Sequence, residues 1–169
     1  SGYYSVKNTA GIDGFHSDKT VYYKPVNEKS KTVLDISQNG SSVTYKWQVE
    51  VKQTNGSFRG KTISDVMNAA SNDGKSIKSV LDPDSIIMYV QRNGKGSYET
   101  LNSSNYTVVP NADNTSFEIK FNDSEEFDNI NLVQIQYSST VDVTGLDAGT
   151  IINVNNNAAY KGETFGPSA

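Results

Sequence analysis

The sequence predicts an all-β protein built as a sandwich of two sheets. Short segments in which apolar and polar residues alternate follow one another along the chain, and turn signals rich in Gly and Asn separate them. Alternation of this kind places one face of a strand in a core, and this spacing is typical of sandwiches rather than of parallel α/β sheets. We therefore expect two packed sheets with one or two short helical turns.

The composition bounds the number of domains. With 169 residues, 35% of them hydrophobic, the chain is long enough for one well-packed domain. We expect this domain at residues 21–165. Residues 1–20 are predicted to be a leader or the closing strand of an upstream domain, together with a linker, and residues 166–169 a tail. The start at Ser1, without an initiator Met, predicts a piece of a longer protein.

Charge and residue usage argue against several kinds of site. The chain has no cysteine and a single histidine, His16, which excludes disulfides and cysteine nucleophiles and disfavours histidine-based metal sites. A net charge of −4 without a basic stripe disfavours nucleic acid as a partner. No apolar run is long enough to span a membrane, so we expect no membrane insertion. We predict neither a cofactor nor a metal.

The first part of the domain supplies three strand candidates. Residues 21–26 form an edge or entry segment because Pro25 cannot donate to a ladder, and residues 31–36 form a second candidate. Asn39-Gly40 is a turn signal. The clearest strand is 43–51, in which apolar side chains alternate without a break against Thr, Lys, Gln and Glu. This pattern predicts a central strand with one face in the core.

The middle of the chain is less regular. Residues 61–71 are predicted to hold a short strand followed by one or two helical turns, with Ser64 or Asp65 as the N-cap. A strand is expected at 86–90, then a turn at Asn93-Gly94 and a second strand.

The last part returns to clear alternation. Residues 105–121 predict a pair of strands, residues 123–128 an acidic solvated loop without the spacing of a calcium site, and residues 132–143 a long strand. Gly145 and Gly149 mark the turn into a closing strand.

The closing strand, 151–162, carries a polar residue on its apolar face. Alternation places Ile152, Val154, Asn156 and Ala158 on one side. A buried amide costs about 1–3 kcal/mol unless it is paired, so Asn156 needs a partner or a covalent role. The segment VKNTAGIDG at 6–14 repeats the pattern VNNNAAYKG at 154–162, which fits a chain that begins on the closing strand of a preceding domain.

Lys31 and Asp65 are the candidates to meet Asn156. The first and last strands of a sandwich commonly lie side by side, so a Lys on one can reach an Asn on the other. A neutral Lys amine could attack the carboxamide, expel ammonia and leave an amide between the two side chains. This requires burial that lowers the pKa of the amine, a protonated carboxyl group that shuttles protons, and a fold that holds the groups in contact.

Other residues remain open for each role. Asp35 shares the predicted face of Lys31 and Val33, while Leu34 and Ile36 point the other way, so Lys24 and Lys29 are alternative amines. Asn155 and Asn157 are alternative carboxamides. An ordinary helix N-cap is the alternative for Asp65, and a hydrogen-bonded core amide is the alternative for Asn156. The aromatic residues Tyr45, Trp47, Tyr137 and Tyr160 are expected in the core rather than in a sugar-binding platform.

Several segments together resemble a known family. The run from Lys31-Thr32 through the strand with Val43 and Trp47 to TISD at 62–65, followed by LDPDSIIMYV, NTSFEIKF and VNNNA, is similar to the A-type domain of the staphylococcal collagen adhesin and its relatives in Gram-positive surface proteins and pilins. The resemblance covers residues 21–165. It implies an immunoglobulin-like sandwich with extra strands and an internal Lys–Asn isopeptide bond, with Lys31 as amine, Asp65 as catalytic acid and Asn156 as carboxamide.

These observations predict a structural stalk or adhesin module of an extracellular, cell-wall-anchored protein rather than an enzyme. A bond between 31 and 156 would close a long loop and stabilise the fold by roughly 4–5 kcal/mol, by analogy with a disulfide. The expected partners are neighbouring domains of the same chain. The alternative is a ligand-binding adhesin module without the cross-link, which would bind a host extracellular-matrix protein or a glycan.

Overall fold

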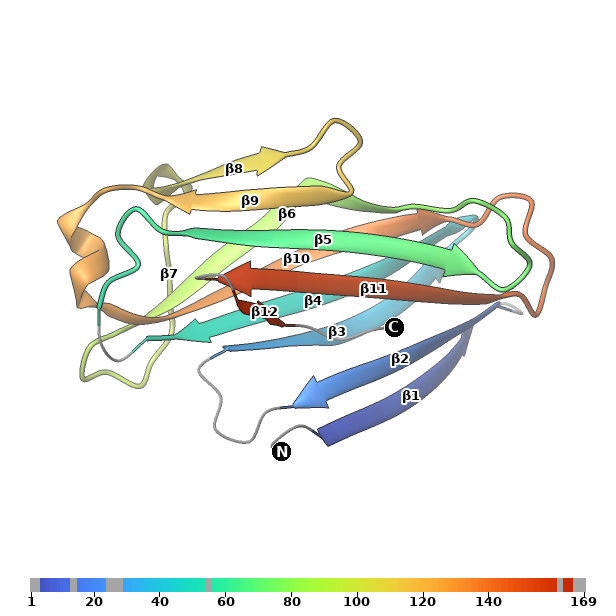
Figure 1. Cartoon of the computed structure of the whole chain (residues 1–169), viewed down its shortest axis with the longest axis horizontal. Coiled ribbons are helices and arrows are strands. Elements are labelled where there is room, and N and C mark those ends of the chain that lie inside the picture. Colours follow the sequence, from blue (N-terminus) through green and yellow to red (C-terminus); the bar gives the residue numbers. More distant parts are fainter. Residues whose placement is uncertain (1–3, 13–14, 24–28, 54–55, 161–162, 166–169) are drawn as a thin grey trace.

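The structure, a computed structural model, describes residues 4–12, 15–23, 29–53, 56–160 and 163–165. In these ranges the chain forms two sheets that pack face to face (Figure 1). The elements in chain order are β1 (Tyr4–Ile12), β2 (Phe15–Tyr23), β3 (Lys29–Asn39), β4 (Ser42–Lys52), β5 (Thr62–Ser71), β6 (Ser79–Arg92), β7 (Glu99–Thr100), the 3₁₀ turn η1 (Ser103–Asn105), β8 (Tyr106–Pro110), β9 (Ser116–Phe121), the 3₁₀ turn η2 (Glu125–Asn129), β10 (Ile130–Asp142), β11 (Ile151–Tyr160) and β12 (Glu163–Phe165).

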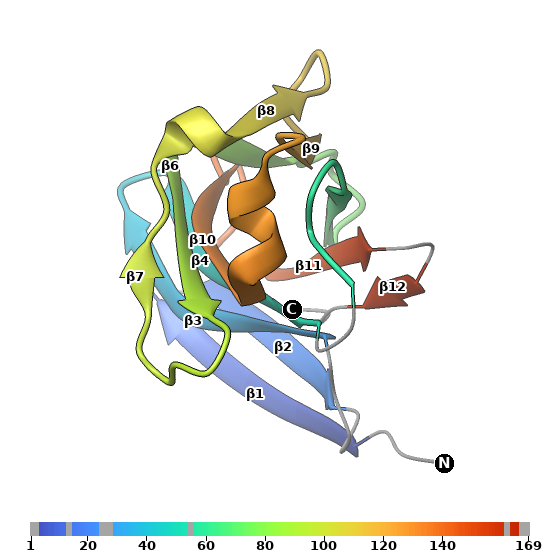
Figure 2. The same ribbon diagram turned by 90° about the vertical axis from the view of Figure 1, so that its left-hand side faces the viewer.

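The strands divide into a seven-stranded and a five-stranded sheet. The first, sheet A, has the order β1-β2-β11-β5-β9-β8, with β12 also paired to β11. The second, sheet B, has the order β3-β4-β10-β6-β7. Neighbours pair antiparallel except β2 and β11, which pair parallel over Ile151 to Asn153. The view in Figure 2 shows the two layers, with η2 at the near end of the sandwich. The predicted two-sheet sandwich is confirmed.

The core lies between the sheets and is built by the alternation that the sequence shows. Val43, Tyr45, Trp47, Val49 and Val51 of β4 are all buried, and the residues between them are partly or fully exposed. β4 lies inside sheet B, between β3 and β10, so the prediction of a central strand is confirmed. The buried aromatic residues of the core include the four expected there, Tyr45, Trp47, Tyr137 and Tyr160.

The helical turns predicted after Lys61 are wrong. Residues 62–71 form strand β5 throughout, because residues 63–71 pair with β11 and residues 62–66 also pair with β9. The described helical turns lie elsewhere, at η1 and η2. Asp65 therefore lies in the middle of a strand, and its interpretation as a helix N-cap is wrong. Part of the predicted acidic loop at 123–128 is the turn η2, capped by Ser124.

A register shift in β3 corrects the predicted face of its residues. Val33 pairs with Trp47, whereas Asp35 pairs with Lys46, so one residue of β3 is extra at this point. A bulge of this kind reverses the alternation beyond it. Asp35 is exposed, and Ile36 packs against the core instead. The conflict between Lys31 and Asp35 therefore disappears.

The first described residues form a hairpin that extends sheet A. β1 and β2 pair antiparallel from Tyr4 with Tyr23 to Ile12 with Phe15, and β2 lies beside the start of β11 (Figure 1). The segment predicted as a leader or the closing strand of an upstream domain, together with a linker, thus contains strands within the described ranges. The division of the chain at residue 20 stays a prediction.

Candidate functional site

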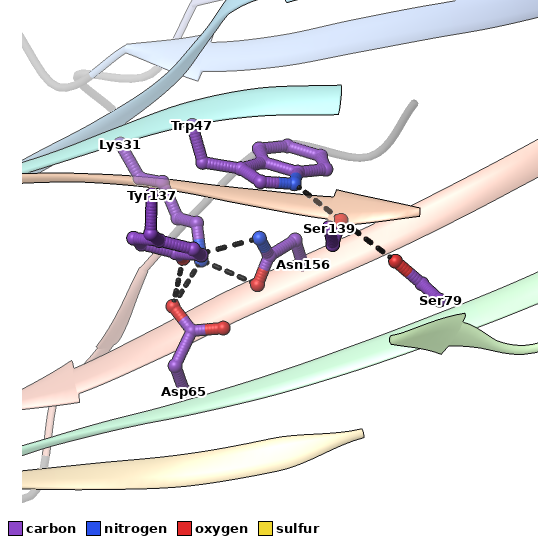
Figure 3. A network of polar contacts seen from close by, with 7 residues as sticks. All are labelled: Lys31, Trp47, Asp65, Ser79, Tyr137, Ser139 and Asn156. Carbon is purple, nitrogen blue, oxygen red and sulfur yellow. Dashed lines mark hydrogen bonds and ion pairs between the residues drawn. The ribbon is translucent and has the colours of Figure 1, made fainter. Parts of the chain in front are cut away.

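Four polar side chains meet in the core between the two sheets, and we call them the lysine cluster: Lys31, Asp65, Tyr137 and Asn156. Lys31 comes from β3 and Tyr137 from β10, both in sheet B, whereas Asp65 comes from β5 and Asn156 from β11 in sheet A. The cluster therefore joins the two sheets (Figure 3).

The ladders explain why these residues meet. In sheet A, Asp65 pairs with Ala158 and Asn156 pairs with Met67, so Asp65 and Asn156 are diagonal neighbours on the inner face. In sheet B, Lys31 pairs with Val49 on β4, one strand away from β10. The long Lys31 side chain reaches across β4, and its Nζ lies 5.5 Å from the ring centroid of Trp47 and 5.3 Å from that of Tyr137.

All four side chains are shielded from water. The exposed fraction is 3% for Lys31, 1% for Asp65 and Tyr137, and 0% for Asn156. Charged residues are almost never fully buried unless they are paired, so this cluster carries a large desolvation cost.

Hydrogen bonds connect each of the four side chains to at least two of the others. Nζ of Lys31 donates to Oδ2 of Asp65 and to Oδ1 of Asn156. The hydroxyl of Tyr137 donates to the same Oδ2 of Asp65. Nδ2 of Asn156 donates to the Tyr137 hydroxyl oxygen at 3.2 Å. Oδ1 of Asp65 is buried and has no hydrogen-bond partner within the described ranges of the chain.

Burial shifts both ionisable partners toward their neutral forms. Desolvation lowers the pKa of Lys31 to about 8, against the opposing effect of Asp65. Desolvation also raises the pKa of Asp65, although Lys31 and Tyr137 act against this rise. Oδ1 of Asp65 accepts no hydrogen bond from the described residues, which favours the neutral acid further, because hydrogen bonds to a carboxylate stabilise its charged form. Proton transfer from Lys31 to Asp65 is therefore easier here than in water.

The arrangement can support nucleophilic attack by an amine on a carboxamide. The amine of Lys31 contacts the carboxamide oxygen of Asn156, and the carboxyl group of Asp65, which can take and give protons, contacts the same amine. The fold holds these groups in contact, which supplies the effective concentration that a bimolecular reaction lacks. Among the described residues, no group of three or more His, Cys, Asp or Glu side chains is arranged to hold a metal ion.

The structure brings together the three residues named first from the sequence and separates them from the alternatives. Lys31, Asp65 and Asn156 contact one another, whereas Lys29 lies partly exposed at the start of β3. Asn155 and Asn157 lie on the exposed face of β11. Lys24, the other alternative amine, lies outside the described residues. Their roles in a reaction stay predictions.

Tyr137 was not predicted from the sequence as a member of the site. It was expected in the core, and it lies there on the face of β10 that also carries Val133 and Ile135. The hydroxyl group was the overlooked signal, because a buried Tyr usually finds a hydrogen-bond partner for its O–H. A Tyr on an inner face opposite a buried Asn and Asp was therefore a candidate partner for both.

A second buried polar group, which we call the serine cluster, lies in the same core: Trp47, Ser79 and Ser139. The indole Nε1 of Trp47 donates to Oγ of Ser139 at 2.9 Å, and the Ser79 hydroxyl donates to the same oxygen at 2.9 Å (Figure 3). All three residues belong to sheet B, and none of them is ionisable.

Comparisons with known proteins support the fold. No protein-family model and no curated protein sequence matches the chain. The crystal structure of the RrgA Jo.In complex matches with a TM-score of 0.51 at 12% identity, covering 96% of this chain and 92% of that chain. This likeness shows a shared fold, and the immunoglobulin-like sandwich that the sequence resemblance implied is confirmed.

Other solved structures match with lower scores. The collagen-binding domain from a Staphylococcus aureus adhesin has a TM-score of 0.47 at 13% identity, covering 82% of this chain and 94% of that chain. The collagen-binding subdomain of the Enterococcus faecalis surface protein ACE has a TM-score of 0.43 at 16% identity, covering 83% of this chain and 95% of that chain.

In the described part of this chain, no helix has the length and apolar character needed to cross a membrane.

Proposed function

We propose that this chain is a structural module that cross-links itself through an isopeptide bond between Lys31 and Asn156, with Asp65 as the catalytic carboxyl group. The observation that carries the proposal is the contact of a fully buried Lys amine with both a carboxyl group and a carboxamide oxygen. A buried ion pair of this kind is weak as a source of stability, because desolvation offsets much of the attraction. A chemical role accounts for its place in the core.

The proposed reaction joins Nζ of Lys31 to Cγ of Asn156 and releases ammonia. Asp65 takes a proton from the amine and so generates the nucleophile, as a general base does. The reaction takes place once in each chain, so the module acts on itself and turns over no substrate. The product is a neutral amide, which removes the buried charge of the amine.

The mechanical consequence follows from the positions of the two residues. The bond spans 125 positions of the chain and joins β3 of sheet B to β11 of sheet A. A cross-link of this length restricts the unfolded chain and stabilises the fold by roughly 4–5 kcal/mol on the chain-entropy model. It supplies what disulfides supply in other secreted domains, and this chain has no cysteine.

The proposed setting is the surface of a Gram-positive cell, in a cell-wall-anchored stalk or adhesin. The sequence resemblance to A-type domains of surface proteins and pilins supports this setting, together with the confirmed fold. A module of this kind would bear load between neighbouring domains and resist proteolysis.

The intact mass of the unfolded protein tests the proposal. We expect the wild-type chain to be lighter than its sequence mass by one ammonia molecule, and the variants Lys31→Ala, Asp65→Ala and Asn156→Ala to have their full calculated masses. Matched controls are Lys29→Ala and Asn157→Ala, which change the same residue types at neighbouring positions and should remain lighter by one ammonia. Peptide mapping then identifies the joined residues.

A wild-type chain at its full mass would reject the cross-link. Loss of ammonia that persists in Asn156→Ala but disappears in Asn157→Ala would move the bond to the other face of β11. The first result would leave the ligand-binding module, the alternative predicted from the sequence, as the function to test with extracellular-matrix proteins and glycans.

A further inference from the structure

Tyr137 is the member of the lysine cluster to which the proposed reaction assigns no role. Its hydroxyl donates to Oδ2 of Asp65 and accepts from Nδ2 of Asn156 at 3.2 Å. The hydroxyl therefore bridges the catalytic carboxyl group and the nitrogen that must leave. Figure 3 shows the Tyr137 side chain beside both groups.

The departing nitrogen needs a proton that the amine cannot hand over directly. An amide nitrogen leaves as neutral ammonia only after it gains one proton, because the amide anion is far too basic to depart. After the amine of Lys31 has attacked, Nδ2 is no longer conjugated with a carbonyl group and can accept a proton. The group in hydrogen-bond contact with Nδ2 is the Tyr137 hydroxyl.

Asp65 does not reach this nitrogen itself. Its Oδ2 contacts Lys31 and Tyr137, and its Oδ1 has no hydrogen-bond partner in the part of the chain that the structure describes. A proton held by Asp65 therefore reaches Nδ2 through Tyr137. The contacts form a continuous path from the Lys31 nitrogen to Asp65, then to Tyr137, and then to the leaving nitrogen.

We propose that Tyr137 is a catalytic proton relay that delivers the proton of Asp65 to the ammonia leaving Asn156. This inference rests on the proposed function and adds a residue to it. Tyr137 gives its hydroxyl proton to Nδ2 while it receives the proton of Asp65, so it ends as the neutral phenol with which it began.

The protons balance when they are counted from the ion pair of Lys31 and Asp65. The ammonium nitrogen has three protons and the product amide nitrogen has one, so two protons leave it. The first passes to Asp65 before the attack and then through Tyr137 to Nδ2, as the bond between Cγ and Nδ2 breaks. The second passes from the new amide nitrogen to Asp65, which ends as a neutral acid.

The surroundings of Tyr137 suit a relay that never carries a net charge. Burial, followed by the neighbouring charge of Asp65, raises the pKa of Tyr137 well above its ordinary value. The phenol therefore does not ionise by itself, and it releases its proton only as another arrives. The ring packs edge-on against Phe117 at 5.0 Å between centroids, which fixes the position of the hydroxyl.

The rate of bond formation in Tyr137→Phe tests the relay. The chain of residues 1–169 is made by cell-free translation, samples are quenched in acid at timed intervals, and intact mass gives the fraction that has lost ammonia. We expect bond formation to be about a hundredfold slower in Tyr137→Phe than in the wild type, the size of a typical proton-transfer contribution. The matched control Tyr160→Phe removes another buried Tyr hydroxyl, which donates to Gln53 at 2.6 Å, and should react at the wild-type rate.

A second variant separates proton transfer from packing. Replacement of Tyr137 by 3-fluorotyrosine keeps the ring and the hydroxyl but makes the phenol more acidic, so a relay changes the rate by at least about twofold. The same replacement at Tyr160 controls for the added fluorine. If Tyr137→Phe does not fold, this measurement decides alone.

The outcomes separate the relay from the proposed function. A wild-type chain that loses ammonia while Tyr137→Phe reacts at the same rate overturns the relay and leaves the cross-link intact. A slow Tyr137→Phe with an unchanged 3-fluorotyrosine rate also overturns it, because Tyr137 would then act by packing alone. A wild-type chain that never loses ammonia contradicts the proposed function itself.

Discussion

The lysine cluster and the serine cluster are two polar groups in one core, and they satisfy their hydrogen bonds differently. In the serine cluster, the donors of Trp47 and Ser79 both lie 2.9 Å from the Ser139 oxygen, and every group is neutral. In the lysine cluster, Lys31 and Asp65 form a buried ion pair, and Oδ1 of Asp65 has no hydrogen-bond partner among the described residues. The serine cluster lies within sheet B, whereas the lysine cluster joins both sheets.

The difference shows that a neutral buried network costs little free energy, whereas a buried ion pair remains costly. A neutral network with paired donors has modest energetic consequences, because its hydrogen bonds replace those made to water. A buried ammonium and carboxylate remain costly even when they are paired. Formation of a neutral amide removes the amine charge and leaves Asp65 as a neutral acid, so the proposed reaction turns the lysine cluster into a network of the same kind as the serine cluster.

The largest expected difference between the clusters is in unfolding free energy. In Asn156→Ala the cross-link over 125 positions cannot form, so we expect the free energy of unfolding to fall by roughly 4–5 kcal/mol. Denaturant titration of this variant beside the wild type measures the change. Asn157→Ala, on the exposed face of the same strand, should change it by less than about 0.5 kcal/mol.

This comparison would be contradicted if the free energy of unfolding fell no further in Asn156→Ala than in Ser139→Ala. The two clusters would then contribute to stability in the same way, through hydrogen bonds alone.

The lysine cluster should also make bond formation depend on pH. The reactive state has one proton shared between Lys31 and Asp65, so the rate falls at low pH, where both are protonated, and at high pH, where neither is. Burial lowers the pKa of Lys31 from 10.5 to about 8 and raises that of Asp65 from 3.8, so the two limbs lie closer together than these ordinary values. We expect the limb on which the rate falls with rising pH to lie near pH 8, the lowered pKa of Lys31.

Timed mass measurements on freshly translated protein across a pH series check this profile. Outside the window the rate should fall by roughly tenfold per pH unit, which corresponds to about 1.4 kcal/mol. A rate that stays constant between about pH 5 and pH 10 would mean that the two groups keep their ordinary pKa values.

The serine cluster tests the other side of the comparison. In Ser139→Ala the donors of Trp47 and Ser79 both lose their acceptor inside the core, so we expect the free energy of unfolding to fall by about 2 kcal/mol. Ser37→Ala, at an exposed position of β3, is the control and should be nearly neutral. The mass of Ser139→Ala should still be lower by one ammonia, because no proton in the proposed reaction passes through Ser139. A full-mass Ser139→Ala would join the two clusters into one functional unit.

The sequence predicted the features that depend on alternation. Val43 to Val51 and Ile152 to Tyr160 alternate without interruption, and both strands have the predicted inner faces. Asn156 stood out because it is polar on an apolar face. Lys31 and Asp65 were its candidate partners among the polar residues placed early in the chain, and the resemblance to a family then assigned them the roles of amine and catalytic acid.

Features that depend on tertiary pairing could not be predicted. The extra residue in β3 between Val33 and Asp35 arises from pairing with β4, so alternation alone gave the wrong face for Asp35. The segment 62–71 has weak local preference, and its pairing with β9 and β11 made it a strand. Tyr137 was a candidate hydrogen-bond partner by its residue type, but its position opposite Asp65 and Asn156 depends on how the two sheets pack, which alternation does not give.

Ser79→Ala is the smallest change expected to distinguish a neutral network from an ionisable one. Ser79 donates to Ser139, which still accepts from Trp47 when the Ser79 hydroxyl is removed. The substitution removes this one hydrogen bond and leaves the bond from Trp47 to Ser139 in place. The free energy of unfolding therefore falls by about 1 kcal/mol, the net value of one hydrogen bond. Denaturant unfolding of Ser79→Ala, Ser139→Ala and the double variant measures this. Because the two residues share one hydrogen bond, the double variant should be less unstable than the sum of the single changes. Strict additivity would show that the two serines act independently and that the serine cluster is not a network.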